Sequence, residues 1–166
     1  MADSKTVSEL VRPDRRLLSV GPDATATDVA VFMKTNRIGC VVVTDKHGKL
    51  AGILSERDLV CKVLGVGADP GKVRAGDLMT REVMTCTPQT PVQDAERAMA
   101  HRRVRHLPVV QEGKPVAVIS MRDVLGERLK TYRSIVSSQS AFLEKLESSY
   151  PGISQIEKDK TGRIVI

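Results

Sequence analysis

Apolar residues alternate along the chain between short β-branched runs of strand length and longer sets with helical spacing. Thr25 or Thr27 is a suitable N-cap for the first helical set, and Gly39 follows its end. The first half therefore predicts strands over 17–20, 40–43 and 50–54 and helices over about 25–36 and 55–64.

The second half contains the same order of patterns. It predicts strands over 83–86, 106–110 and 116–119, a helix over about 91–102, and another that begins at Ser120. Each half thus has the order strand, helix, strand, strand, helix. This order is typical of an α+β fold in which helices cover the sheets.

The repetition extends to individual residues. The segment Gly48–Asp58 (GKLAGILSERD) returns 65 residues later as Gly113–Asp123 (GKPVAVISMRD). Two copies of one unit predict a pair with pseudo-twofold symmetry and two equivalent clefts between them. A repeat of this size is marginal for burying a core alone, so we expect the halves to share one.

The closing helix of the second half continues far beyond its counterpart in the first. Between Met121 and about Ser149 there is no proline, which predicts a helix of about 40 Å. Its apolar residues follow a heptad pattern with one polar position, formed by Leu125, Leu129, Tyr132, Val136, Gln139, Leu143 and Leu146. This seam predicts a homodimer through the helix; the alternative is a helix folded back in two pieces.

These patterns divide the chain into six segments. We expect a loose N-terminal arm over 1–16 and a tail over 151–166, read as a small hairpin around Asp159–Gly162 or an ordered end. Between them lie repeat 1 at 17–66, a linker at 67–82, repeat 2 at 83–130 and a helical extension at 131–150.

Composition narrows the class of protein. The 166 residues are 41% apolar and 28% charged, as in soluble globular proteins. No apolar run approaches the roughly 20 residues of a membrane span, and no apolar secretory segment begins the chain. We therefore expect a cytoplasmic protein without a membrane partner. The net charge of +6 favours anionic partners, but 2% aromatic residues and no tryptophan argue against nucleic acid.

Motifs for metal binding and catalysis are missing from the sequence. Cys40, Cys61 and Cys86 have no CxxC spacing, and the three histidines do not pair with them at metal-ligand spacing. We expect reduced thiols and no metal. No GxSxG, HExxH, Walker lysine motif or Cys–His pair occurs, so we expect no enzyme.

The repeated Ser-x-x-Asp has two readings. Ser55 and Asp58, like Ser120 and Asp123, lie where an apolar strand turns into a helix, and Ser with Asp three residues later resembles a capping box. The same place also suits a nucleotide, because a helix N-terminus and an adjacent arginine bind phosphate while the carboxylate accepts a ribose diol. The small residues Gly52 and Ala117 would let an adenine approach the strands.

With these motifs in two copies, residues 17–130 resemble a tandem cystathionine β-synthase (CBS) domain pair, or Bateman module. The segments DLMT (77–80) and RVRHLPVV (103–110) are also similar to family segments. The resemblance implies a stand-alone regulatory module that binds AMP most readily, or ADP, ATP or NAD(H), and acts on an unidentified partner protein. It also implies dimerisation into a disk. Ala117 departs from the family's glycine.

The resemblance also implies the site residues. Asp58 and Asp123 would hold ribose hydroxyls, and Ser55, Arg57, Ser120 and Arg122 would face phosphate. The clefts would be bordered by Ile38, Gly39, Cys40, Thr80, Arg105, His106, Leu107 and Pro108. Arg105 and His106 make the second cleft the stronger anion site. Two alternatives stay open: a ligand-free dimerisation module, and a binder of an adenosyl ligand such as S-adenosylmethionine.

Overall fold

The computed structural model describes residues 5–11, 17–149, 157–158 and 164–165. Residues 1–124 form one compact unit and residues 125–166 a second. In repeat 1, strands β1, β2 and β3 form a sheet in that order, with β1 parallel to β2 and β3 antiparallel to it. The elements of repeat 1 are β1 (Ser19–Val20), α1 (Ala26–Asn36), β2 (Cys40–Thr44), β3 (Leu50–Ser55) and α2 (Glu56–Lys62).

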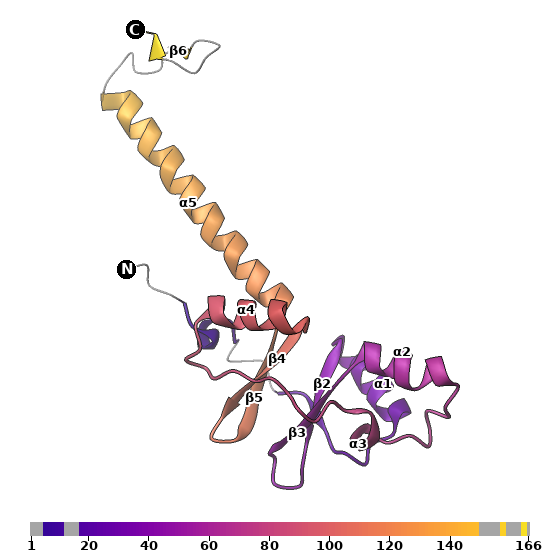
Figure 1. The fold of residues 1–166 in the computed structure, drawn as a ribbon. Helices are drawn as coiled ribbons and strands as arrows, with labels where there is room; N and C mark the ends of the chain where they lie inside the picture. Colours follow the sequence, from indigo (N-terminus) through magenta and orange to yellow (C-terminus); the bar gives the residue numbers. More distant parts are fainter. Residues whose placement is uncertain (1–4, 12–16, 150–156, 159–163, 166) are drawn as a thin grey trace. The chain divides into compact units, whose positions relative to one another are not determined.

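Repeat 2 has a two-stranded sheet in its described residues, with β4 antiparallel to β5 as β2 is to β3 (Figure 1). Its elements are α4 (Val92–Arg102), β4 (His106–Gln111), β5 (Lys114–Ser120) and α5 (Met121–Ser149). Short helices η1 (Val7–Glu9), η2 (Leu64–Val66) and α3 (Ala75–Leu78) lie outside these elements. The predicted α+β fold of two repeats followed by a long helix is confirmed.

Local side-chain chemistry fixes where α1 begins and ends. Thr25 is the N-cap, since its hydroxyl accepts from the Asp28 amide at 3.1 Å while Asp28 Oδ2 accepts from the Thr25 amide at 3.0 Å. The helix ends at Asn36, as predicted, but the residue that ends it is Arg37, in the left-handed conformation with φ 53°, and not Gly39. Arg103 ends α4 in the same way.

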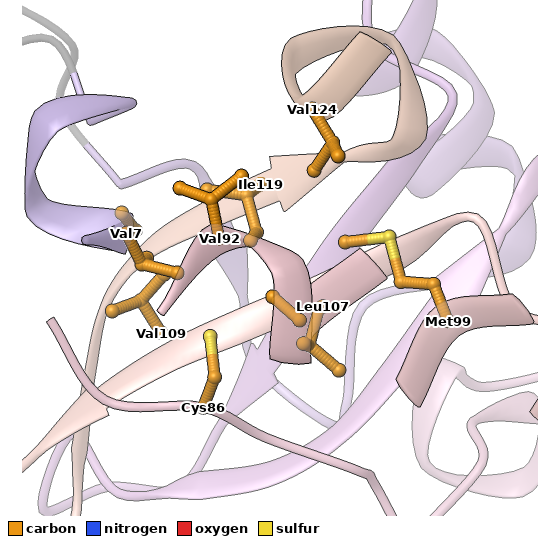
Figure 2. Close-up of a cluster of buried hydrophobic side chains, with 10 residues drawn as sticks. Val7, Cys86, Val92, Met99, Leu107, Val109, Ile119 and Val124 are labelled. Carbon is orange, nitrogen blue, oxygen red and sulfur yellow. The ribbon is translucent and has the colours of Figure 1, made fainter. Parts of the chain in front are cut away.

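The buried side chains form two clusters, one in each repeat, and the expected single shared core is wrong. Each cluster is completed by a segment outside its repeat. The linker supplies Ala75, Leu78 and Met79 to the first, and Val7 enters the second (Figure 2). These additions enlarge cores that repeats of this length would otherwise leave small.

Residues 5–11 are not the loose arm that the sequence predicts. Val7 is fully buried, and its amide donates to the Thr90 carbonyl at 2.9 Å. The Val92 amide in turn donates to the Lys5 carbonyl at 2.9 Å. The segment is thus held on repeat 2, although it precedes repeat 1 in the chain.

The predicted strand over 83–86 is wrong, because only Cys86 pairs, with Val109, in an isolated parallel bridge. The Cys86 amide donates to the Pro108 carbonyl and the Val110 amide to the Cys86 carbonyl. The next bond in one direction would need an amide hydrogen on Pro88, and in the other an amide hydrogen on Pro108. Proline has none, so the ladder cannot extend either way.

The second unit contains most of α5, which has the predicted length as one continuous helix. Exposed apolar side chains follow the seam at Leu125, Leu129, Tyr132 and Val136, while those of Leu143 and Leu146 lie outside the described set. Strands β6 (Glu157–Lys158) and β7 (Ile164–Val165) pair antiparallel as a hairpin does; the turn expected between them lies outside the described residues. In the described part of the chain, no helix has the length and apolar character needed to span a bilayer.

Candidate functional site

The first unit contains a cavity of about 950 Å³ lined by residues of both repeats. Equivalent positions of the two repeats border this cavity, at the start of a strand and the start of a helix. In repeat 1 the Glu56 amide donates to the Gly39 carbonyl, and in repeat 2 the Met121 amide donates to the Arg105 carbonyl. The predicted site residues that line it are Ile38, Gly39, Cys40, Arg105, His106, Ser120, Arg122 and Asp123. Repeat 2 therefore contributes its Ser-x-x-Asp, whereas repeat 1 does not.

Asp123 lines the cavity from the first turn of α5. Its Oδ2 accepts from the Ser120 amide at 2.7 Å and from the Ser120 hydroxyl at 2.5 Å. The Asp123 amide donates back to the Ser120 hydroxyl at 3.3 Å, which completes a capping box. The residues that the structure describes give Oδ1 neither a hydrogen bond nor an ion pair. One carboxylate oxygen thus caps the helix and the other can accept hydrogen bonds from a ligand.

Asp58 has the same cap and one more partner. Its Oδ2 accepts from the Ser55 amide at 2.9 Å and hydroxyl at 2.6 Å, while its Oδ1 lies 2.7 Å from Lys62 Nζ. Partial burial by itself raises the pKa of Asp58, but the hydrogen bonds from Lys62 and Ser55 outweigh it, and the pKa lies below its ordinary value. Lys62 Nζ also donates to the Leu78 carbonyl at 2.6 Å.

Gly52 makes room for the linker, not for an adenine as the sequence suggested. A Cβ at Gly52 would lie 2.6 Å from Met79 Sδ and 2.9 Å from the Thr80 carbonyl oxygen. The linker is held there by reciprocal bonds, Ile53 amide to Thr80 carbonyl at 3.0 Å and Thr80 amide to Ile53 carbonyl at 2.9 Å. Thr80 therefore pairs with β3 and is not among the cavity's lining residues.

The other predicted residues lie partly inside and partly outside the cavity lining. Arg57 is exposed and Leu107 and Pro108 are buried, with Leu107 in the core of repeat 2, and none of them lines the cavity. Arg105 and Arg122 are exposed residues of its lining. Lys34 and Arg37 of repeat 1 line the cavity as well, so cations from both repeats can meet an anion there.

His106 lies between groups of both signs. Burial and the neighbouring Arg105 lower its pKa below the ordinary value, and the carboxylates of Glu56 and Asp123 oppose that shift. His106 therefore takes up a proton only in more acid solution than an ordinary histidine does.

Glu56 is a lining residue that the sequence reasoning missed. Its carboxylate lies beside Gly39, where a Cβ would be 3.2 Å from Oε2. The signal was present in the quoted repeat, because the matching position of the second copy is Met121, a change from acid to thioether. Each repeat thus contributes both signs of charge to the cavity lining: Glu56 with Lys34 and Arg37 from repeat 1, and Asp123 with Arg105 and Arg122 from repeat 2.

Comparison with known proteins agrees with the duplicated architecture. The family model described as CBS domain matches twice, at residues 7–65 and 75–130. The chain belongs to the CBS-domain family. CBS pairs are a class of regulatory, ligand-binding modules. The fold and the two matched repeats place the chain in that class.

Individual CBS proteins show the same likeness. A protein of Methanopyrus kandleri, MK0525, is 33% identical over 86% of this chain and 72% of its own length. The crystal structure of a CBS-domain protein from Agrobacterium tumefaciens, ATU1752, is 34% identical with a TM-score of 0.69, covering 75% of this chain and 99% of that one. A cyanobacterial CBS-CP12 protein described as hexameric is 27% identical with a TM-score of 0.67, over 74% of this chain and 67% of that one.

Proposed function

We propose that this CBS pair is a non-enzymatic sensor that binds an adenine nucleotide in the cavity between its repeats. AMP is the favoured ligand, and ADP, ATP and NAD(H) carry the same adenosine phosphate. The observation that carries the proposal is the free Oδ1 of Asp123 in a cavity that also contains Arg105 and His106. The volume of about 950 Å³ falls within the range of small-ligand sites.

Asp123 would hold the ribose. A carboxylate oxygen has two lone pairs and can accept from both hydroxyls of a diol, and charged acceptors form the stronger hydrogen bonds. Oδ2 is already held by Ser120, which fixes the direction of Oδ1 before a ligand arrives. Because the Asp123 side chain is already ordered, little conformational entropy is lost when a ligand binds to it.

Arg105, Arg122 and His106 would meet the phosphate. Guanidinium groups bind phosphate oxygens in pairs, and both arginines lie at the cavity. An adenosyl ligand such as S-adenosylmethionine has no phosphate and a cationic sulfonium, so these residues disfavour it. Lys34 and Arg37 of repeat 1 also line the cavity and would attract phosphate, while Glu56 would repel a phosphate placed beside it.

Self-association through α5 belongs to the same proposal. The stripe of Leu125, Leu129, Tyr132 and Val136 is widened by Ile135 and Phe142, which are 48% and 62% exposed. Apolar side chains in this number on one helix face favour burial against another helix. A second copy of the chain offers an identical stripe, and a homodimer buries both. Nucleotide binding would then act on a regulated protein through the shape or assembly of the dimer.

Thermal unfolding tests the ligand. A nucleotide that binds the folded state raises its free energy of unfolding by about 2.7 kcal/mol at a hundredfold excess over Kd. We expect AMP to raise the Tm, and Asp123→Ala to weaken AMP binding by about 1–3 kcal/mol, the scale of a hydrogen bond to a charged group. Absence of a Tm shift with AMP, ADP, ATP and NAD(H) would favour a ligand-free dimerisation module; a shift with S-adenosylmethionine alone would favour the adenosyl reading.

A further inference from the structure

We propose that the two Ser-x-x-Asp motifs have different roles: the second binds the ligand, while the first is closed by Lys62 and holds the linker. The chain would then bind one nucleotide and not two. The part concerning ligand number rests on the proposed function. The part concerning Asp58 rests on the structure of repeat 1 alone.

The closure is a chain of three groups, which we name the Lys62 latch: the Asp58 carboxylate, the Lys62 ammonium and the Leu78 carbonyl. Lys62 Nζ lies 2.7 Å from Asp58 Oδ1 and 2.6 Å from the Leu78 oxygen. The Asp58 side chain is only 20% exposed, so this ion pair is partly shielded from water. With Oδ2 held by Ser55, both oxygens of Asp58 are engaged.

The latch joins α2 to a segment that completes the core of repeat 1. Leu78 and Met79 are 5% and 8% exposed and belong to the buried cluster of that repeat. Thr80 continues the contact by pairing with Ile53 of β3. Lys62 therefore fastens the C-terminal end of α2 to the linker at the point where the linker enters the core.

The space beside the first motif is also filled, whereas the space beside the second motif is open to the cavity. Next to Gly52, Met79 and the Thr80 carbonyl occupy the position that a Cβ would need. Ala117 is the counterpart of Gly52 in repeat 2, and it lines the cavity. The side chain at this position thus lines the cavity in repeat 2, whereas in repeat 1 the linker occupies the corresponding space.

The sequence carries the same asymmetry. Lys62 lies 65 residues before Glu127, which is the spacing of the repeat. A glutamate cannot form an ion pair with an aspartate, so the second motif has no counterpart of the latch cation at that position. The charge reversal leaves Asp123 available where Asp58 is neutralised.

Matched substitutions test the division of roles. We expect Asp123→Asn to raise the Kd for AMP by tenfold or more and Asp58→Asn to leave it within about twofold. Isothermal titration should give one AMP per chain for the wild-type protein and for Asp58→Asn. Two AMP per chain, or an equal loss of affinity in both variants, would overturn the proposal.

The latch is tested without ligand. Asp28→Asn is the control, because Asp28 forms the same capping box with Thr25 and has no latch lysine. We expect Asp58→Asn to lower the Tm by more than Asp28→Asn does. Lys62→Met should also lower the Tm, and its effect should be largely lost in the Asp58→Asn background, as expected for residues in contact. Lys72→Met, at an exposed ion pair, is the control lysine.

The two proposals fail separately. If the wild-type protein binds no adenine nucleotide, the proposed function is wrong, and the latch is still decided by the ligand-free Tm values. Equal Tm losses for Asp58→Asn and Asp28→Asn, or additive effects of the Asp58 and Lys62 changes, would overturn the latch whatever the protein binds.

Discussion

Met79 occupies the space that a side chain at Gly52 would need. The two residues are far apart in sequence, and a Cβ at Gly52 would come within 2.6 Å of Met79 Sδ. Met79 can move its side chain, but the Thr80 carbonyl at 2.9 Å belongs to the backbone and is fixed by pairing with Ile53. The close approach of the linker to β3 therefore requires glycine at position 52.

Gly52→Ala should consequently destabilise the protein. We expect a loss of about 1–3 kcal/mol in the free energy of unfolding, the usual cost of overpacking a filled site. Urea unfolding measures it. Gly21→Ala is the control, since nothing lies within 4 Å of a Cβ there. A Gly52→Ala protein as stable as the control would mean that the linker is not packed against β3.

Val7 should be a core residue of repeat 2 in solution. It is fully buried among Val92, Val109 and Ile119, so Val7→Ala removes buried methyl groups and leaves a cavity. We expect a loss of about 2 kcal/mol, within the range for large-to-small core substitutions. Val31→Ala, at a position that is 58% exposed, should change stability by less than about 0.5 kcal/mol. Equal effects in chemical denaturation would show that residues 5–11 do not dock.

The pKa of His106 gives stability a predictable dependence on pH. The pKa is lowered in the folded protein, so the unfolded chain takes up the proton more readily. The contribution of His106 is therefore present above its ordinary pKa of about 6.5 and is lost as the pH falls below that value through the folded pKa. His106→Gln should flatten the decline in Tm between about pH 6.5 and 5.

A phosphate ligand should reverse this effect in the bound state. An anion beside His106 favours the imidazolium, which raises the histidine's pKa and causes proton uptake on binding. Calorimetry of AMP binding in buffers of different ionisation enthalpy measures that uptake, and His106→Gln should reduce it. Equal uptake by wild type and variant would place the phosphate away from His106; the variant also corrects for titration of the phosphate itself.

The exposed stripe of α5 should be the self-association surface. Leu129→Glu together with Val136→Glu puts two charges into the seam, and desolvating them opposes helix pairing. We expect light scattering after size exclusion to show the mass falling to that of one chain. Ala141→Glu, on the face of the helix opposite the stripe, should leave the mass unchanged. A dimer that survives the double substitution would place the interface elsewhere.

The candidate site was only partly predictable. Arg105, His106, Ser120 and Asp123 line the cavity as the motif suggested, while Ser55, Asp58 and Thr80 do not. Each capping box forms within four consecutive residues, so the spacing of Ser and Asp was enough to predict both boxes. Which box is open depends on Lys62 and Met79, whose contacts with Asp58 and Gly52 cannot be read from either motif.

By itself the sequence determined the duplicated α+β plan, a first helix capped at Thr25 or Thr27, and the length of α5, because caps and apolar spacing act over a few residues. Only the tertiary structure decided that Val7 completes repeat 2, that two prolines reduce a strand to one bridge at Cys86, and that one of two matching carboxylates is closed. These outcomes depend on contacts between segments that lie far apart in the chain. A sequence repeat does not show which distant residues each copy will contact, so two matching motifs can have different neighbours.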